Sequence, residues 1–249
     1  MLELGKAEYE LMYSSEDSFW WYKGMREITR VLFSRLGIME DESREIFDLG
    51  CGTGYNLKFL MSHGETFGME PSGQALRFLA LRKPGNVVRA DARALPFSDE
   101  SFDLVCSFDV LEYILEETLV IEEIFRVLRN GGLVFIRDAA FPCLKGEHDR
   151  SSGIQRRYTA STLSTSLSQA GFKVLFSTYA NFLLFPAIAG LRIFREHLLP
   201  HSQISKSDIY RSPRFLNGFL GKVMNLEALL HKTFRLPFGI SVVVVGQKS

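Results

Sequence analysis

The chain has 249 residues, of which 46% are apolar and 23% are charged, and its 29 Lys and Arg residues balance its 29 Asp and Glu residues. These proportions are close to the average of folded soluble proteins, so they exclude a disordered chain, a collagen and a coiled coil. The length allows either one large domain or two small domains, each able to bury a core without disulfide staples.

The apolar pattern alternates between helical and strand periodicity along the chain. Helical spacing predicts helices at 19–36, 72–82, 118–129 and 161–170, and another between Gly54 and Gly64. Short apolar runs predict seven strands at 45–49, 66–69, 86–90, 102–108, 133–137, 172–178 and 240–246. Because strands and helices alternate at this spacing, we expect a doubly wound, mostly parallel seven-stranded α/β sheet with a Rossmann-like order.

A long connection separates the last two predicted strands. It runs over residues 179–238, and loops of that length are rarely structureless. Apolar residues around Phe185 and Phe194 predict one helix in it, and those around Phe219 and Leu226 predict another. We expect this segment to be a helical insertion before the last strand that forms a cap over the sheet.

A glycine-rich loop follows the first predicted strand. Gly50, Gly52 and Gly54 let the backbone turn tightly and approach a ligand where a Cβ atom would collide. The loop opens a helix, whose N-terminus carries free N–H groups and a partial positive charge. Nicotinamide and flavin folds use a similar loop, so the glycines alone do not identify the ligand.

Carboxylates close three successive predicted strands. Asp48 comes just before the glycine loop, Glu70 follows 22 residues later, and Asp91 follows 21 residues after that. The carboxyl ends of parallel strands form the edge where ligands bind in open α/β sheets, and an acidic residue at the second strand can chelate a ribose diol. Asp48 would repel a dinucleotide pyrophosphate and attract the cationic methionine end of S-adenosylmethionine.

Several motifs in one order make residues 45–132 resemble the class I S-adenosylmethionine-dependent methyltransferases of the type 11-like kind. The motifs are DLGCGTG at 48–54, GMEPS at 68–72, ADA at 90–92, LPF at 95–97, SFDLV at 101–105 and RVLRNGG at 126–132. The resemblance implies S-adenosyl-L-methionine as cofactor and S-adenosyl-L-homocysteine as product. It implies cofactor contacts by Asp48, Gly50, Cys51, Gly52 and Gly54 at the methionine part, Glu70 and Pro71 at the ribose, Asp91 and Ala92 at the adenine, and Phe108 and Asp109 beside them.

The N-terminal segment resembles an aromatic element of a bacterial subgroup of these enzymes. It contains FWWY at 19–22 followed by Arg26, and the resemblance implies that Arg26 contacts the cofactor carboxylate while Tyr13 or Trp20 covers the cofactor. The alternative is a helix that packs these aromatic rings into the core. We expect one methyltransferase domain over 1–249, with a covering element at 1–44, a cofactor-binding core at 45–178, the cap at 179–238 and the last strand at 239–249.

Catalysis by such an enzyme is mainly alignment of two reactants, and a base is needed only where the acceptor must lose a proton. The family usually has His where Tyr113 stands, so His148 is the first candidate base, with Asp149, Tyr158 and Tyr113 after it. A single His can instead have a purely structural role. Candidate substrate contacts are Arg156, Arg157, Tyr179 and Asn181. The two arginines suit an anionic substrate or belong to a solvated turn.

Charge is unevenly divided between the two parts of the chain. Residues 144–249 carry 14 Lys and Arg against 5 Asp and Glu, whereas residues 1–143 carry 15 against 24. A basic part favours an anionic partner, although segregated surface charges give the same count. We expect a small-molecule, saccharide or lipid-like acceptor that is anionic or partly apolar, with peripheral contact to a membrane surface. The sequence sets no oligomeric state.

Cysteine usage and the remaining apolar runs bear on compartment and metal. Cys51, Cys106 and Cys143 are widely separated and form no CxxC pair, which favours a reducing compartment. The chain shows neither a secretory signal nor an apolar run of about 20 residues, so we expect a cytoplasmic protein. No cluster of His, Asp or Glu has metal-ligand spacing, so we expect no metal.

Three other functions compete with methyl transfer. A nicotinamide-dependent oxidoreductase would have a glycine at position 55, where Tyr55 stands. A non-catalytic protein that binds S-adenosylmethionine or S-adenosylhomocysteine would keep the same loop and carboxylates. Nucleic-acid modification is compatible with the basic part of the chain, but the sequence lacks a target-base motif such as Asn-Pro-Pro-Tyr, so a nucleic-acid partner is not expected.

Overall fold

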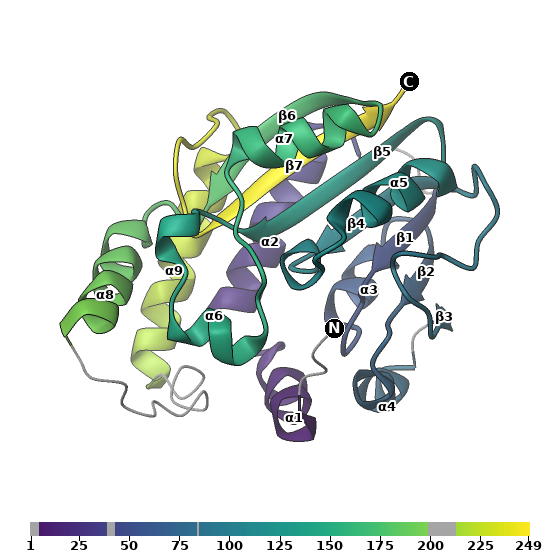
Figure 1. The fold of residues 1–249 in the computed structure, drawn as a ribbon. Coiled ribbons are helices and arrows are strands. Elements are labelled where there is room, and N and C mark those ends of the chain that lie inside the picture. Colours follow the sequence, from purple (N-terminus) through teal and green to yellow (C-terminus); the bar gives the residue numbers. More distant parts are fainter. Residues whose placement is uncertain (1–4, 39–42, 84, 199–212) are drawn as a thin grey trace.

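A seven-stranded sheet forms the middle layer of the protein (Figure 1). The computed structural model describes residues 5–38, 43–83, 85–198 and 213–249. The strands are β1 (Glu45–Leu49), β2 (Glu65–Met69), β3 (Asn86–Val88), β4 (Phe102–Phe108), β5 (Leu128–Ala139), β6 (Phe172–Ala180) and β7 (Ser241–Lys248). Their order is β3-β2-β1-β4-β5-β7-β6, and β7 alone runs antiparallel to its neighbours in this sheet. The predicted doubly wound α/β architecture is confirmed.

β3 and β5 differ from the strands that the sequence predicts, and β2, β6 and β7 differ from their predicted bounds by one or two residues at an end. β3 ends at Val88, because the chain then turns through an isolated bridge between Asp91 and Ala94. β5 begins at Leu128, which pairs with Phe102 across a register shift, rather than at position 133. Gly131 has the expected left-handed φ of 80°, but β5 pairs with β4 both before it, at Leu128, and after it, at Leu133. The glycine therefore lies within β5 rather than before it.

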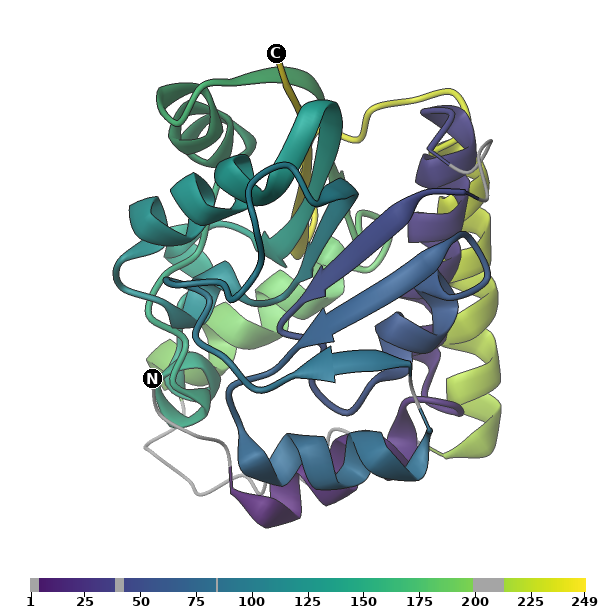
Figure 2. The ribbon, with the colours of Figure 1, turned by 90° about the vertical axis from the view of Figure 1, so that its right-hand side faces the viewer.

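Helices cover both faces of the sheet. They are α1 (Lys6–Ser15), α2 (Trp20–Arg35), α3 (Tyr55–Leu60), α4 (Gly73–Leu81), α5 (Glu117–Val127), α6 (Glu147–Ser152), α7 (Ala160–Gln169), α8 (Phe185–Leu198) and α9 (Arg214–Leu230), with short 3-10 turns at Leu111–Tyr113 and Pro142–Leu144. α5 and α7 lie on one face, and α2 and α9 lie side by side on the other (Figures 1 and 2). The segment 179–238 thus contributes α8 and α9, and α9 extends the helix layer that α2 begins.

The core has one apolar cluster on each face of the sheet. β7 separates them, because Val242 and Val244 point into the cluster beneath α5 and α7, whereas Val243 and Val245 point into the cluster beneath α2 and α9. All four valines are buried, as expected of a strand covered on both faces. No helix in the described part of the chain is long and apolar enough to cross a membrane.

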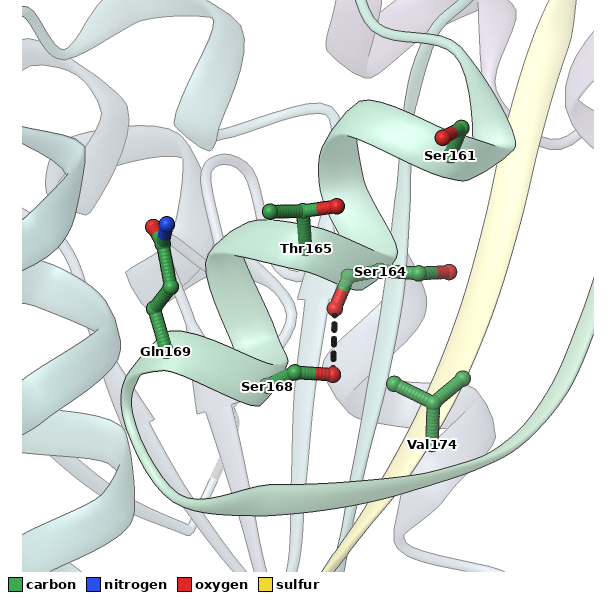
Figure 3. A pocket seen from close by; sticks show the side chains of 6 residues that line it. All are labelled: Ser161, Ser164, Thr165, Ser168, Gln169 and Val174. Carbon is green, nitrogen blue, oxygen red and sulfur yellow. Dashed lines mark hydrogen bonds between the residues drawn. The ribbon is translucent and has the colours of Figure 1, made fainter.

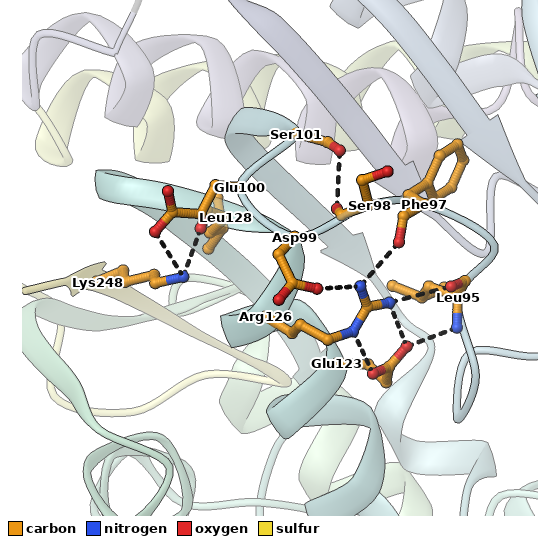
Figure 4. Close-up of polar contacts among 10 residues, drawn as sticks. All are labelled: Leu95, Phe97, Ser98, Asp99, Glu100, Ser101, Glu123, Arg126, Leu128 and Lys248. Atoms are coloured by element: carbon orange, nitrogen blue, oxygen red, sulfur yellow. Dashed lines mark hydrogen bonds and ion pairs between the residues drawn. The ribbon is translucent and has the colours of Figure 1, made fainter.

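Arg126 on α5 fixes the segment that connects β3 to β4 (Figure 4). Its guanidinium donates to the carbonyl oxygens of Phe97 and Leu95 at 2.8 and 3.0 Å, and to Asp99 Oδ1 at 2.8 Å. Glu123, one turn earlier on α5, accepts from Arg126 Nε at 2.7 Å and from the Leu95 N–H at 2.7 Å. The connection is therefore tied to α5 at several points, which positions the residues just after β3.

Candidate functional site

The glycine loop between β1 and α3 has the backbone geometry that its sequence predicts. Gly50, Gly52 and Gly54 have φ values of 71°, 54° and 87°, a region that other residues rarely adopt. A Cβ atom at Gly50 would lie 2.7 Å from Val110 Cγ2, so the loop packs closely there. A Cβ atom at Gly52 would meet nothing within 4 Å, so the backbone of Gly52 borders open space that a ligand can use.

Glu70 faces this loop from the neighbouring strand. β1 and β2 run parallel with Leu49 opposite Met69, so Glu70 follows β2 beside the start of the loop. Its Oε2 atom accepts a hydrogen bond from the Gly52 N–H at 2.9 Å, and its Oε1 atom accepts one from the Ser72 N–H at 2.9 Å. The structure therefore brings together the predicted carboxylate and the predicted glycines.

Asp48 lies buried beneath the loop. Burial raises the pKa of its carboxyl well above the ordinary value, Arg137 opposes this shift, and the charge of Glu70 adds to it. Its Oδ2 atom has no hydrogen-bond partner among the described residues. A cationic group beside Asp48 would satisfy this atom and stabilise the carboxylate form. Burial likewise raises the pKa of the Cys51 thiol. The thiol therefore stays protonated, and Cys51 acts as a small packing residue rather than as a nucleophile.

Arg137 on β5 connects the predicted residues at the end of β4. Its Nη2 atom donates to Asp109 Oδ2 at 2.5 Å, and its guanidinium lies 4.9 Å from the ring centre of Phe108 and 5.8 Å from that of Trp21. Asp109 has a left-handed φ of 59°. Arg137 is buried beside Asp48 and was not expected from the sequence, although a charged residue within an apolar strand is the signal that marks it.

The residues that are predicted to contact the adenine, Asp91 and Ala92, lie shortly after β3. The carboxylate of Asp91 pairs with Arg93, with an Nη2 to Oδ2 distance of 2.7 Å, and this hydrogen bonding lowers the pKa of Asp91. Both side chains of this ion pair are exposed, so the pair contributes little free energy. A hydrogen-bond donor of a ligand can therefore replace Arg93 at Asp91 at a small cost in free energy. Ala92 is buried, and the carbonyl of Pro71 accepts from Arg89 Nε at 2.9 Å.

A set of contacts holds α1 over the loop. Glu16 Oε2 accepts from Thr53 Oγ1 at 2.5 Å and from Arg82 Nη2 at 2.8 Å. The guanidinium of Arg82 also lies 4.6 Å from the ring centre of Tyr13, and the Tyr13 ring packs on Phe78 of α4. Figure 2 shows α1 and α4 side by side below the ends of β1 to β3. Tyr13 therefore lies where α1 packs on α4, and its contact with the cofactor stays a prediction.

Arg26 and Trp20 have different surroundings. The guanidinium of Arg26 lies 4.0 Å from the ring centre of Tyr55, the first residue of α3, so Arg26 stands beside the glycine loop. Burial raises the pKa of Tyr55 to about 12, and its hydroxyl has no partner among the described residues. The Trp20 ring instead packs against the core cluster beneath α2 and α9, and the backbone N–H of Trp20 donates to Asn217 Oδ1 at 2.8 Å.

The candidate bases differ in how far the structure describes them. The side chain of His148 lies outside the described part of the structure. Tyr158 is buried and donates to Glu117, and burial raises the pKa of its hydroxyl, so Tyr158 stays protonated at neutral pH and does not serve as a base there. Tyr113 ends the 3-10 turn that follows β4 and is half-buried.

Two of the four candidate substrate residues make ion pairs within the protein. Arg157 donates from Nε to Asp149 Oδ2 at 2.8 Å and from Nη2 to Asp149 Oδ1 at 2.7 Å, and both side chains are buried. Burial alone would raise the pKa of Asp149, but the hydrogen bonds and charge of Arg157 outweigh it and lower that pKa. Arg156 pairs with Glu117 at 2.9 Å. These guanidinium donors are engaged without a ligand.

The other two candidate substrate residues lie in the interior. Tyr179 stacks on Phe141 with ring centres 5.0 Å apart, and its hydroxyl accepts from the Ala160 N–H at 2.9 Å. Asn181 is fully buried, and its Nδ2 atom contacts Met25 Sδ at 3.0 Å. Arg157 and Tyr179 therefore meet the same segment, at Ala140 and Phe141, and all four candidate substrate residues have contacts within the protein.

A buried pair of carboxyl groups beside the site was not expected from the sequence. The Glu112 N–H donates to Asp138 Oδ1 at 3.1 Å, and Glu112 Oε2 accepts from the Ala139 N–H at 2.7 Å. Burial, with the charge of Asp109, raises the pKa of Glu112 to about 8, and burial with the charge of Glu112 raises that of Asp138. At neutral pH the pair therefore holds at least one proton.

This proton predicts how stability depends on pH. The folded protein keeps Glu112 protonated up to about pH 8, whereas the unfolded chain releases the proton near the ordinary pKa of 4.5. The free energy of unfolding should therefore fall as pH rises through this window. Glu112→Gln keeps the neutral shape, so its melting temperature should fall less between about pH 5 and pH 8. Exposed Glu122→Gln on α5 is the control, and an unchanged pH dependence in Glu112→Gln would contradict the assignment.

A separate open recess of about 390 Å³ lies against α7 (Figure 3). Its lining residues are Ser161, Ser164, Thr165, Ser168, Gln169 and Val174. None of these belongs to the glycine loop or to the strand ends that carry the candidate site. No group of three or more His, Cys, Asp or Glu side chains that could hold a metal ion occurs among the residues described.

Comparison with known proteins connects this site to methyltransferases. A family model described as a methyltransferase domain matches residues 47–136. A malonyl-[acyl-carrier protein] O-methyltransferase of Legionella pneumophila is 34% identical over 121 residues, which cover 45% of this chain and 43% of that protein. The chain therefore spans less than half the length of this relative.

Solved structures share the fold over most of the chain. A chain of the complex between the Haloferax volcanii Trm112 methyltransferase activator and a methyltransferase superposes with a TM-score of 0.61 at 20% identity, covering 98% of this chain and 93% of that one. Phosphoethanolamine N-methyltransferase 2 of Haemonchus contortus, solved with S-adenosyl-L-methionine, superposes with a TM-score of 0.58 at 16% identity, covering 87% of this chain and 52% of that one. At these identities the likeness shows the fold alone.

Proposed function

We propose, from the premise that the chain belongs to the class I S-adenosylmethionine-dependent methyltransferases, that it transfers the methyl group of S-adenosylmethionine to a small-molecule or lipid-like acceptor. The observation that carries this proposal is the contact between the Gly52 N–H and Glu70 Oε2 at the carboxyl ends of β1 and β2. It joins an open, left-handed glycine turn to a carboxylate that can bind a diol.

The residues at this edge fit the cofactor. Glu70 would bind the two ribose hydroxyls, since each of its oxygens accepts one backbone hydrogen bond and has room to accept a second. The unpartnered Oδ2 atom of Asp48 would accept from the ammonium group, and the open side of Gly52 leaves room for the methionine chain. Asp91 and Ala92, just beyond β3, would contact the adenine.

Methyl transfer asks mainly for alignment from this chain. S-adenosylmethionine, when bound, supplies a methyl group that its positively charged sulfur already activates. Holding two reactants in line can lower a barrier by about 7–11 kcal/mol. Arg137 contacts both Asp109 and the ring of Phe108, which restricts the motion of these side chains. They would border the bound cofactor and help to hold it in position.

A nicotinamide dinucleotide fits the same edge poorly. Its pyrophosphate would lie over the glycine loop, where the buried Asp48 carboxyl would have to stay protonated. The third glycine of the dinucleotide pattern is replaced by Tyr55, a buried ring at the start of α3. Both features favour a cationic adenosyl ligand over a dinucleotide.

The donor assignment predicts a thermal shift. At about 100 times its dissociation constant, a ligand stabilises the folded protein by about 2.7 kcal/mol. S-adenosylmethionine and S-adenosylhomocysteine should therefore each raise the melting temperature by roughly 5–10 °C, whereas NAD should leave it unchanged. The measurement is a dye-monitored melt with each ligand. A shift with NAD alone, or with none of the three, would contradict the proposal.

A further inference from the structure

One face of α9 is apolar and exposed. Phe215, Phe219, Leu226 and Leu229 recur every three to seven residues along the helix and are 79%, 62%, 55% and 55% exposed. The opposite side of α9 is also apolar, because Met224 and Ala228 are buried in the cluster shared with α2. A single exposed apolar residue is ordinary, but a row along one helix marks an interaction surface. We call this row the α9 stripe.

Positive charge surrounds the α9 stripe. Arg214, Lys222, Lys232 and Arg235 are all exposed on α9 or just after it. The single acidic residue between positions 213 and 238 is Glu227, and its side chain is buried and accepts from the Leu183 N–H. An apolar stripe bordered by cations and free of exposed acids is typical of a helix that lies in the interface of an anionic membrane.

A recess of about 200 Å³ opens beside the α9 stripe, between α9 and the first turn of α2. Lys23 of α2 and Lys222 of α9 both line it, together with Asn217 and Asn225, and none of its lining residues is acidic. Two ammonium groups and the Asn225 side chain around such a volume suit a phosphate group, whereas the Asn217 amide already bonds to the Trp20 backbone N–H and the Ser18 carbonyl.

Two glycines on α9 enlarge this recess at a cost to the helix. Gly218 and Gly221 line it, and a Cβ atom built at either position would meet nothing within 4 Å. Glycine is a poorer helix former than alanine, so packing within the described protein does not account for it at these positions. Gly24 on α2 differs, because its Cβ atom would lie 2.5 Å from Met224 Cβ. Gly24 allows α2 and α9 to approach, whereas Gly218 and Gly221 keep a volume open.

We propose that α9 docks the protein on an anionic phospholipid membrane, with the α9 stripe at the acyl boundary and a lipid phosphate between Lys23 and Lys222. The argument combines the exposed stripe, the cations around it and the phosphate-sized recess beside it. This docking does not depend on methyl transfer and can be measured without a methyl donor.

Vesicle flotation tests the α9 stripe. The protein should float with vesicles of phosphatidylcholine and phosphatidylglycerol, but not with phosphatidylcholine alone, and high salt should release it. Phe219→Ser with Leu226→Ser should lower the partition coefficient about tenfold or more, because two large side chains no longer leave water. Leu81→Ser with Leu115→Ser is the matched control, since both leucines are 64% exposed and lie away from α9.

Single substitutions test the phosphate recess. Lys222→Ala should weaken vesicle binding about fivefold, whereas Lys58→Ala, an exposed lysine on α3, should not. Gly221→Ala should raise the melting temperature, because alanine favours the helix, while it weakens vesicle binding by filling the recess. A variant that melts at a higher temperature but binds vesicles more weakly has lost a binding site without damage to the fold. Inorganic phosphate should compete with the vesicles.

Three results would overturn the proposal. One is that the wild-type protein does not float with anionic vesicles at low salt. Another is that Gly221→Ala and Lys222→Ala bind vesicles as the wild type does. This result would show that the recess does not bind a lipid phosphate. The third is that light scattering shows a dimer that Phe219→Ser with Leu226→Ser dissociates, without vesicle binding by either protein. The stripe would then be an interface between two copies of the chain.

Discussion

Replacing Glu70 by Gln is expected to weaken the binding of S-adenosylmethionine about 100-fold. The carboxylate can accept a hydrogen bond on each oxygen, as it does from the Gly52 and Ser72 N–H groups. Hydrogen bonds to a charged group contribute about 1.5–3 kcal/mol each, and Gln keeps one acceptor and loses the charge. The net loss of about 2.7 kcal/mol corresponds to the stated factor. Isothermal titration of wild-type and variant proteins measures it.

Glu65→Gln provides the matched control for this substitution. Glu65 lies at the opposite end of the same strand, β2, and its side chain is exposed. The control should bind S-adenosylmethionine with wild-type affinity. If a folded Glu70→Gln protein also keeps wild-type affinity, the adenosyl ribose is not bound at the end of β2.

Replacing Asp149 by Ala is expected to lower the free energy of unfolding by about 3–5 kcal/mol. Asp149 accepts two hydrogen bonds from the buried guanidinium of Arg157 and another from the Gly146 N–H. Removing the carboxylate leaves an uncompensated cation in the interior, because the one other bond from Arg157 goes to the neutral Ala140 carbonyl. Chemical denaturation monitored by circular dichroism measures the loss.

An exposed ion pair supplies the comparison. Asp99 pairs with Arg126 at 2.8 Å, but its side chain is 74% exposed, so Asp99→Ala should cost less than about 1 kcal/mol. Replacing both members of the buried pair, as Asp149→Leu with Arg157→Met, should recover much of the stability, because the buried Arg157 charge leaves with its partner and only the partly exposed Arg192 loses its ion pair with Asp149. Equal losses for Asp149→Ala and Asp99→Ala would show that the buried pair does not stabilise the fold.

Strands and packed helices of this fold are predictable because their apolar residues follow a local period. This local period is present in the central residues of the seven strands and in α2. In β7 it makes Val242 and Val244 face one apolar cluster and Val243 and Val245 face the other. α1 lacks it, since Tyr9 and Ser15 are its only buried residues, and contacts with other elements hold it in place. Its place depends on Glu16 reaching Thr53 and Arg82, which are far away in the sequence.

The meeting of the glycine loop and Glu70 could be predicted because these residues are close in sequence to the strand ends. Asp48, Gly52 and Glu70 have positions fixed by two adjacent parallel strands. Arg137 could not be placed in advance, because its partner Asp109 comes from another strand. Residue type also does not say where a side chain points. Arg157 was expected at a substrate and instead reaches Asp149 in the interior.

The structure of the protein with S-adenosylhomocysteine bound tests the central claim most directly. We predict the ligand at the carboxyl ends of β1 to β3, with both ribose hydroxyls within hydrogen-bond distance of the Glu70 carboxylate. We also predict the ammonium group next to Asp48 Oδ2, the buried oxygen that has no partner among the described residues. A ligand bound elsewhere, or one whose ribose makes no contact with Glu70, would contradict the assignment of this edge as the methyl-donor site.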